Sequence, residues 1–281
     1  MNARFGPAGN SNSFYDAGYK STLQAPQWLQ AQGLTAYEYQ CGRGVRVSAE
    51  SATALGEAAA RCDIAISLHA PYFISLASAE EEKRDNSIRY ILESARAVTQ
   101  MGGTRIVVHP GGLGGLSRPE ATALASHTLR RAQEALDAEG LSNVRICPET
   151  MGKINQLGDL DEVLTFCHID ERFLPCVDFG HLNSRTLGGL NSAEAFAKLL
   201  DRLHNELGEE RASNFHAHFS KIEYTKGGEK RHLTFEDTVF GPDPTPLMKL
   251  IRERKLSPTF ICESDGTQAE DARTLSVLYK G

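Results

Sequence analysis

The sequence predicts a single (β/α)8 barrel, or TIM barrel, that spans residues 1–281. Short apolar runs alternate with helical segments along the whole chain, as they do in the βαβ units of a parallel sheet. No charge-rich or Pro/Ser-rich linker divides the chain into two parts. The length of 281 residues also suits one large barrel, because such domains have about 250 residues.

Eight segments have the apolar, often β-branched composition of buried strands. They are residues 4–6, 36–39, 64–68, 105–108, 144–147, 174–177, 214–218 and 259–262. Consecutive strands are separated by stretches that are long enough to hold a crossover helix. The segments therefore account for the eight strands of one closed barrel.

Helix start and stop signals lie between these strands. We expect helices over residues 21–32, 48–61, 78–101, 117–140 and 191–208. Ser48 and Ser117 stand at N-cap positions, and Pro119 follows in the first turn of its helix. Gly140 stands where that helix should end.

Composition excludes several classes of protein. Hydrophobic residues make up 41% and charged residues 23% of the chain, which excludes a disordered or fibrous protein. No apolar run approaches the roughly 20 residues of a membrane helix, and residues 1–7 lack the apolar segment of a signal peptide. The formal net charge of −6 argues against a surface that coats nucleic acid everywhere. We expect a cytoplasmic monomer.

The cysteines suggest neither a zinc knuckle nor a disulfide framework. None of the six forms a C-x-x-C pair, and they are scattered through a long chain. We expect buried free thiols. They are Cys41, Cys62, Cys147, Cys167, Cys176 and Cys262.

Histidine and carboxylate side chains stand at the C-terminal ends of six consecutive predicted strands, where the active sites of barrels lie. Imidazoles and carboxylates that converge on one mouth are typical ligands of zinc or manganese. Burying so many titratable groups without a metal would cost several kcal/mol. The residues are His69, His109, Glu149, Asp178 with His181, His216 with His218, and Glu263.

These stretches resemble the endonuclease IV family of apurinic/apyrimidinic endonucleases, in the barrel superfamily that also includes xylose isomerase. The matching stretches follow the family order over nearly the whole chain. They are HAPYFISL at 69–76, VHPG at 108–111, PET at 148–150, VDFGH at 177–181, HAHFSK at 216–221, KRH at 230–232 and CES at 262–264.

The resemblance implies a cluster of three metal ions. His69, His109 and Glu149 would hold the first ion. The bridging Glu149 would hold the second with Asp178, His216 and Glu263. His181 and His232 would belong to the third site.

The chain departs from the family pattern at three places. Lys230 occupies the position of the Asp ligand of the third site, Phe179 and Gly180 precede His181, and His218 and Phe219 stand in the strand-seven motif. A protonated amine cannot be a ligand, so we expect two firmly bound zinc ions and a third site that is empty or partly filled, unless Glu229 supplies a carboxylate. Lys230 either offers its charge to a bound phosphate or is a solvated loop residue.

Residues on two mouth loops are candidates for contact with a substrate. Arg43 and Arg46 flank glycines in one loop and suit phosphate contact. Tyr72, just past His69, could stack on a base. His218 is a further candidate. We expect most acidic residues to lie on the helices that face away from this mouth.

Three functions compete at this stage. The first is a metal-dependent phosphodiesterase of DNA repair that cleaves at abasic sites, with Glu149, Glu263 and Lys230 as catalytic residues. The second is a sugar isomerase or epimerase that acts on a small phosphorylated sugar with one metal, in which Glu149 and Glu263 transfer protons. The third is a metal-stabilised barrel that binds a ligand without turnover. The His69 and His109 pair and the Tyr72 loop favour the nuclease, whereas Lys230 and the altered strand-seven motif favour the isomerase.

Overall fold

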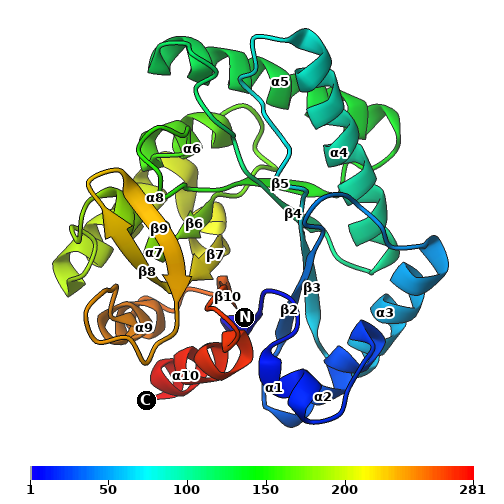
Figure 1. Ribbon diagram of the computed structural model, residues 1–281, viewed down its shortest axis with the longest axis vertical. Helices are drawn as coiled ribbons and strands as arrows, with labels where there is room; N and C mark the ends of the chain where they lie inside the picture. Colours follow the sequence, from blue (N-terminus) through cyan, green and yellow to red (C-terminus); the bar gives the residue numbers. More distant parts are fainter. Residues whose placement is uncertain (1) are drawn as a thin grey trace.

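Eight parallel strands close into a barrel in the computed structural model, which describes residues 2–281 (Figure 1). They form two four-stranded groups, in the orders β1-β10-β7-β6 and β2-β3-β4-β5. Backbone hydrogen bonds from Gly9 to Glu38 (2.9 Å) and from Thr150 to Cys176 (3.0 Å) join the groups at both seams. The predicted barrel is confirmed, and each predicted strand overlaps an observed one. The strands are β1 (Arg4–Pro7), β2 (Ala36–Gln40), β3 (Ala65–His69), β4 (Arg105–Val108), β5 (Arg145–Pro148), β6 (Cys176–Asp178), β7 (His216–Phe219) and β10 (Thr259–Cys262).

Helices surround the barrel. The five predicted helical segments all contain helix, although the last helix continues past Gly208, where the backbone kinks at φ 77°. Among residues 2–281, no helix is long and apolar enough to cross a membrane. The helices are α1 (Asn12–Asp16), the 3-10 turn η1 (Thr22–Gln24), α2 (Ala25–Ala31), α3 (Ala49–Arg61), α4 (Glu81–Gln100), α5 (Arg118–Ala138), α6 (Leu160–Cys167), α7 (Phe179–Arg185), α8 (Ala193–Ser213), α9 (Pro244–Glu253) and α10 (Gln268–Lys280).

Apolar side chains fill the layer between the strands and the helices. Phe179 is fully buried there. Its ring centroid lies 5.8–6.4 Å from those of Phe196, Phe215, Phe219 and Phe260. The residue that departs from the family motif is therefore part of the core of this barrel. All six cysteines are free thiols, as expected, and five of them are buried.

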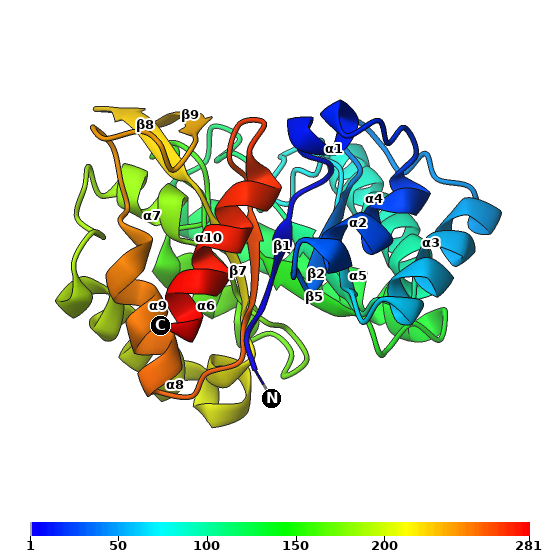
Figure 2. The same ribbon diagram turned by 90° about the horizontal axis from the view of Figure 1, so that it is seen from below.

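An antiparallel hairpin, which the sequence did not predict, follows β7. Its strands are β8 (Lys221–Thr225) and β9 (Gly228–Leu233). The hairpin lies at the end of the barrel opposite the N-terminus, which is the end where the parallel strands finish (Figure 2). It therefore adds residues to the mouth at which barrel active sites are built.

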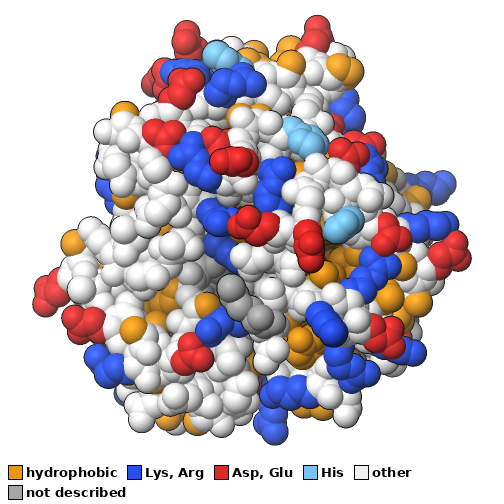
Figure 3. Space-filling view, turned by 180° about the vertical axis from the view of Figure 1, so that it is seen from behind, with side chains coloured by type: hydrophobic (Ala, Val, Ile, Leu, Met, Phe, Trp, Pro, Cys, Tyr) orange, Lys and Arg blue, Asp and Glu red, His pale blue; other side chains and the backbone are white. Residues whose placement is uncertain are grey.

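The face of the molecule opposite the hairpin exposes acidic and basic side chains together (Figure 3). It carries lysine and arginine side chains among aspartates and glutamates (Figure 3). Both signs of charge are therefore exposed on this face, and the expected distribution of acids relative to the mouth stays a prediction.

Candidate metal centre

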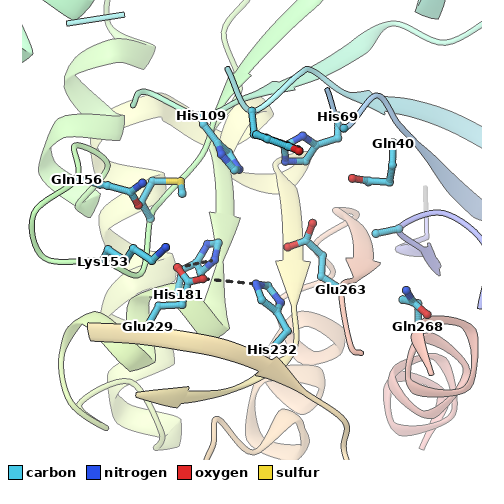
Figure 4. Close-up of a pocket in the computed structure, with 14 residues that line it drawn as sticks. Gln40, His69, His109, Lys153, Gln156, His181, Glu229, His232, Glu263 and Gln268 are labelled. Carbon is cyan, nitrogen blue, oxygen red and sulfur yellow. Dashed lines mark ion pairs between the residues drawn. The ribbon is translucent and has the colours of Figure 1, made fainter. Parts of the chain in front are cut away.

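Five of the predicted ligands line one cavity at the C-terminal end of the strands: His69, His109, His181, His232 and Glu263 (Figure 4). The cavity has a volume of about 610 Å³, and its walls include His69, His109, His181 and Glu263. Glu149 is fully buried beside them. Five groups of side chains each bring their ligand atoms within 4.8 Å of one another, and three of them are described below. The other two are His69 with His218 and Glu263, and Cys176 with His216 and His218.

The first group consists of His69, His109 and Glu149. Oε2 of Glu149 lies 3.3 Å from Nε2 of His69 and 2.9 Å from Nε2 of His109. Nδ1 of His69 donates a hydrogen bond to the carbonyl of Ala70 at 2.8 Å. The same ring therefore directs Nε2 at the carboxylate, which is how a second hydrogen bond commonly orients a metal-binding histidine.

The second group consists of Glu149, Asp178, His218 and Glu263. Nδ1 of His218 lies 3.1 Å from Oε1 of Glu149 and 3.5 Å from Oε2 of Glu263. One oxygen of Asp178 accepts a hydrogen bond from the backbone of His181 at 2.7 Å and caps α7. The other oxygen of Asp178 is buried without a hydrogen-bond partner. Glu149 is thus common to the first two groups.

His218, rather than His216, takes the histidine position beside Asp178 and Glu263. The structure corrects the two assignments together, because the fully buried His218 cannot contact a substrate from the cavity as we expected. Nε2 of His216 instead forms a hydrogen bond of 2.9 Å with Glu38. Burial lowers the pKa of His216 to about 4, against the effect of Glu38.

The third group consists of His181, Glu229 and His232. Oε2 of Glu229 lies 3.5 Å from Nε2 of His181, and Oε1 lies 4.0 Å from Nε2 of His232. Nδ1 of His181 forms a hydrogen bond of 3.0 Å with the carbonyl of Thr150. Nδ1 of His232 forms one of 2.9 Å with Oγ of Ser220. The hairpin therefore supplies a carboxylate to this site through Glu229.

Lys230 does not face the third site. Its ammonium and the guanidinium of Arg231 both pair with Glu223, at 2.5 and 2.7 Å. The register of the hairpin shifts between Glu223 and Tyr224, which leaves Lys230 as the extra residue of β9. This irregularity lets Lys230 and Arg231 both reach Glu223, while Glu229 faces the histidines. The expected role of Lys230 at a bound phosphate is not supported by this placement.

Two buried carboxylate oxygens at the centre have no hydrogen-bond donor. Oε2 of Glu149 and Oδ2 of Asp178 are buried, and no donor is aligned with either atom. Nitrogens that face carboxylate oxygens need a cation between them, either a proton or a metal ion. The mixture of imidazoles and carboxylates fits a first-row divalent ion such as zinc or manganese.

Without a metal, protons on the histidines supply the positive charge that the carboxylates need. Burial opposes a charge on His69, but the hydrogen bond and charge of Glu149 raise its pKa to about 9. Burial also opposes a charge on His181, but Asp178 and Glu149 raise its pKa to about 10. Burial alone would raise the pKa of Glu149, yet the charges of His218 and His109 hold it well below its usual range. The centre therefore favours bound positive charge.

Glu38 is a residue of this centre that the sequence interpretation missed. It is fully buried inside the barrel, and its Oε1 lies 3.0 Å from Nε2 of His218. Its other oxygen contacts His216 and accepts a hydrogen bond from Oγ of Ser67 at 2.8 Å. The signal was a single carboxylate in an apolar strand, on the face that alternates with Tyr37 and Tyr39.

Of the predicted substrate-contact residues, Tyr72 lies at the rim of the cavity. Tyr72 lines it, and its side chain is 50% exposed beside Phe73. Nε of Arg43 donates a hydrogen bond of 3.1 Å to the Tyr72 hydroxyl. Arg46 is exposed on the same loop as Arg43, but it does not line the cavity.

Comparison with known families agrees with this architecture. The profile of the Xylose isomerase-like TIM barrel family matches residues 26–278. The chain belongs to this family. An uncharacterized protein of Methanocaldococcus jannaschii is 36% identical over 92% of this chain and 91% of its own length. A probable endonuclease 4 of Thermoplasma acidophilum is 28% identical over 67% of this chain and 63% of its own length.

Solved structures of this family's fold include enzymes of two classes. Endonuclease IV of Thermus thermophilus superposes with a TM-score of 0.70 at 20% identity over 99% of both chains. A D-tagatose 3-epimerase-like protein superposes with a TM-score of 0.71 at 19% identity over 99% of this chain and 97% of its own. Likeness at this level of identity reports the shared fold, so function must be argued from the site.

Proposed function

We propose that this protein is a metal-dependent phosphodiesterase that cleaves the DNA backbone at abasic sites. The observation that carries the proposal is the arrangement of three adjoining ligand groups, two of which share Glu149. A one-metal isomerase needs only one such group. Neighbouring ions held by a shared carboxylate suit the in-line displacement of a phosphodiester.

When bound, the ions would act as Lewis acids on the phosphoryl group and would activate the attacking water. Glu149 holds the first two ligand groups together through its two oxygens. Glu263 lines the cavity, and the positive charge of His218 overcomes the effect of burial and keeps its pKa below the usual value. An ionised Glu263 is thus placed to accept a proton inside the cavity.

The rim supports a nucleic-acid substrate. The half-exposed rings of Tyr72 and Phe73 lie 5.1 Å apart between centroids and present an aromatic surface on which a base can stack. Arg43 is held beside Tyr72 by its hydrogen bond and is exposed for phosphate contact.

A nicking assay tests the proposal. Chelator-treated protein is reloaded with zinc or manganese and incubated with duplex DNA that carries one abasic analogue, and with the matched intact duplex. We expect a nick at the abasic position only. Glu149→Gln should bind little metal and give no nick, because it loses the charge shared by two ligand groups.

Two outcomes would overturn the proposal. One is an intact abasic duplex after incubation with fully metal-loaded protein. The other is epimerisation of a ketose or a sugar phosphate by that protein, followed by NMR, without any cleavage of DNA. The second outcome would assign the centre to the isomerase class.

A further inference from the structure

The loop that follows β5, Met151–Leu157, is held rigidly at the wall of the cavity. The guanidinium of Arg185 donates hydrogen bonds to the carbonyls of Met151 (3.2 Å) and Lys153 (2.7 Å). Arg118 donates to the carbonyls of Ile154 (2.6 Å) and Gln156 (3.1 Å). Two arginines therefore bind the outer, carbonyl side of this loop and fix its backbone.

The hairpin and the loop after β4 hold the same segment from two further directions. The backbone amide of Ile154 donates to the carbonyl of Gly227 at 3.1 Å, and that of Leu157 donates to Gly111 at 3.0 Å. Gly228 has a φ of 89°, and a Cβ there would lie 2.2 Å from the carbonyl oxygen of Gly152. Only glycine allows this approach, so the sequence itself specifies the contact between hairpin and loop.

Two side chains of this fixed loop, Lys153 and Gln156, line the cavity. Lys153 points toward His181 and Glu229, and Gln156 lies on the same wall, further toward His109 (Figure 4). Among residues 2–281, the Lys153 ammonium has neither an ion pair nor a hydrogen bond. Oε1 of Gln156 is buried without a hydrogen-bond partner. Gln156 lines the cavity, and among residues 2–281 its side-chain NH2 group donates no hydrogen bond, so this group is available to a ligand.

Three other cations near the mouth are already engaged. Lys230 and Arg231 pair with Glu223, and Lys221 donates to the carbonyl of Phe235 at 2.9 Å. Among the described residues that line the cavity, Lys153 is the one lysine or arginine. A cation with no protein partner, on a rigid loop and next to unsatisfied amide atoms, is preorganised for an anionic ligand.

We propose that Lys153 and Gln156 bind the non-bridging oxygens of a phosphoryl group next to the third ligand group. In a cavity lined by several carboxylates, a phosphate needs fixed positive charge and hydrogen-bond donors on its outer side as well as metal ions on its inner side. The phosphoryl group belongs to abasic DNA if the proposed function holds, and a free sugar phosphate would offer the same chemistry.

The test measures metal-loaded protein in two assays. Titration calorimetry gives the affinity for inorganic phosphate, and fluorescence anisotropy gives the salt dependence of binding to duplex DNA with an abasic analogue. Lys153→Gln should weaken phosphate binding about tenfold and should lower the slope of log K against log salt by about 1, the value for one phosphate contact. Gln156→Ala should weaken phosphate binding by a smaller factor. Metal content is measured for every variant.

Two controls separate a specific contact from a general loss of charge. Lys153→Arg keeps the cation and should restore both values. Lys249→Gln makes the same substitution at an exposed lysine of α9, away from the cavity, and should behave as wild type. Equal binding by wild type and Lys153→Gln, or an equal loss in Lys249→Gln, would overturn the subsite.

The results distinguish a failure of the phosphate subsite from a failure of the proposed function. If phosphate binding depends on Lys153 but abasic DNA is neither bound nor cut, the subsite stands with a small phosphorylated ligand and the DNA function is wrong. If abasic DNA is cut but neither assay responds to Lys153, the function stands and the subsite is wrong. If wild type binds neither probe, both are wrong.

Discussion

Removal of the metal should make the stability of this protein depend steeply on pH above neutrality. In the metal-free centre, carboxylates raise the pKa of His69 to about 9 and that of His181 to about 10, from 6.5. A group whose pKa is raised by folding stabilises the native state fully below its unfolded pKa. That contribution is lost as the pH rises toward the folded pKa. The free energy of unfolding should therefore fall between pH 6.5 and about pH 9–10.

The magnitude follows from the number of protons held. Each group contributes about 1.4 kcal/mol per pH unit within this window, so two groups contribute about 3 kcal/mol per unit. Between about pH 7 and about pH 8.5 the metal-free protein should lose at most about 4 kcal/mol. This value is an upper limit, because both histidines depend on the same Glu149 charge.

Urea unfolding of chelator-treated and metal-loaded protein at these two pH values measures the effect. The metal-loaded protein should show little of this dependence, because a ligated imidazole nitrogen holds no proton in either condition. Glu149→Gln removes a carboxylate charge shared by both histidines and should flatten the metal-free profile. The reasoning would be refuted by a metal-free protein that is equally stable at both pH values, or by a metal-loaded protein with the same slope.

Two further substitutions test separate parts of the structure. Glu229→Gln should lower the metal content by one ion per chain in elemental analysis, because His181 and His232 keep only two imidazoles at the third group; unchanged content would remove Glu229 from the ligand set. Phe179→Ala should lower the free energy of unfolding by about 3–5 kcal/mol in urea titrations, because the ring is fully buried among four other phenylalanines. A loss below about 1 kcal/mol would contradict the role of Phe179 in the core. The metal content of the Phe179→Ala variant should not change.

The barrel could be predicted because strand and helix signals are local. Runs of apolar residues mark the strands, and Ser48 marks a helix start where its side chain accepts a hydrogen bond from Ser51. The hairpin after β7 was not predicted, since residues 221–233 carry charged and polar side chains in place of a clear alternation. Its position depends on long-range contacts such as that between Gly228 and Gly152, which no local pattern reports.

At the candidate centre, residue types were easier to predict than partners. His181 and His232 are visible as histidines in the sequence, but whether Glu229 or Lys230 faces them depends on the phase of β9. The phase is set when the hairpin docks on the loop after β5. The register shift at Lys230 lets Glu229 and His232, three residues apart, face the same site. No local pattern marks this irregularity, so sequence alone left both alternatives open.

The exchange of His216 and His218 has a different physical origin. The two histidines are two residues apart on β7, so both point into the barrel, one about 7 Å deeper than the other. Strand register decides which level meets the ligands: Asp178 pairs with His218, whereas Cys176 pairs with His216. A match to a sequence motif compares the order of the residues. It does not show how far each residue lies from the mouth along the barrel axis. The deeper His216 contacts Glu38, and Glu38 contacts His218 in turn, so the His-Ala-His sequence places a candidate ligand and its support on one strand.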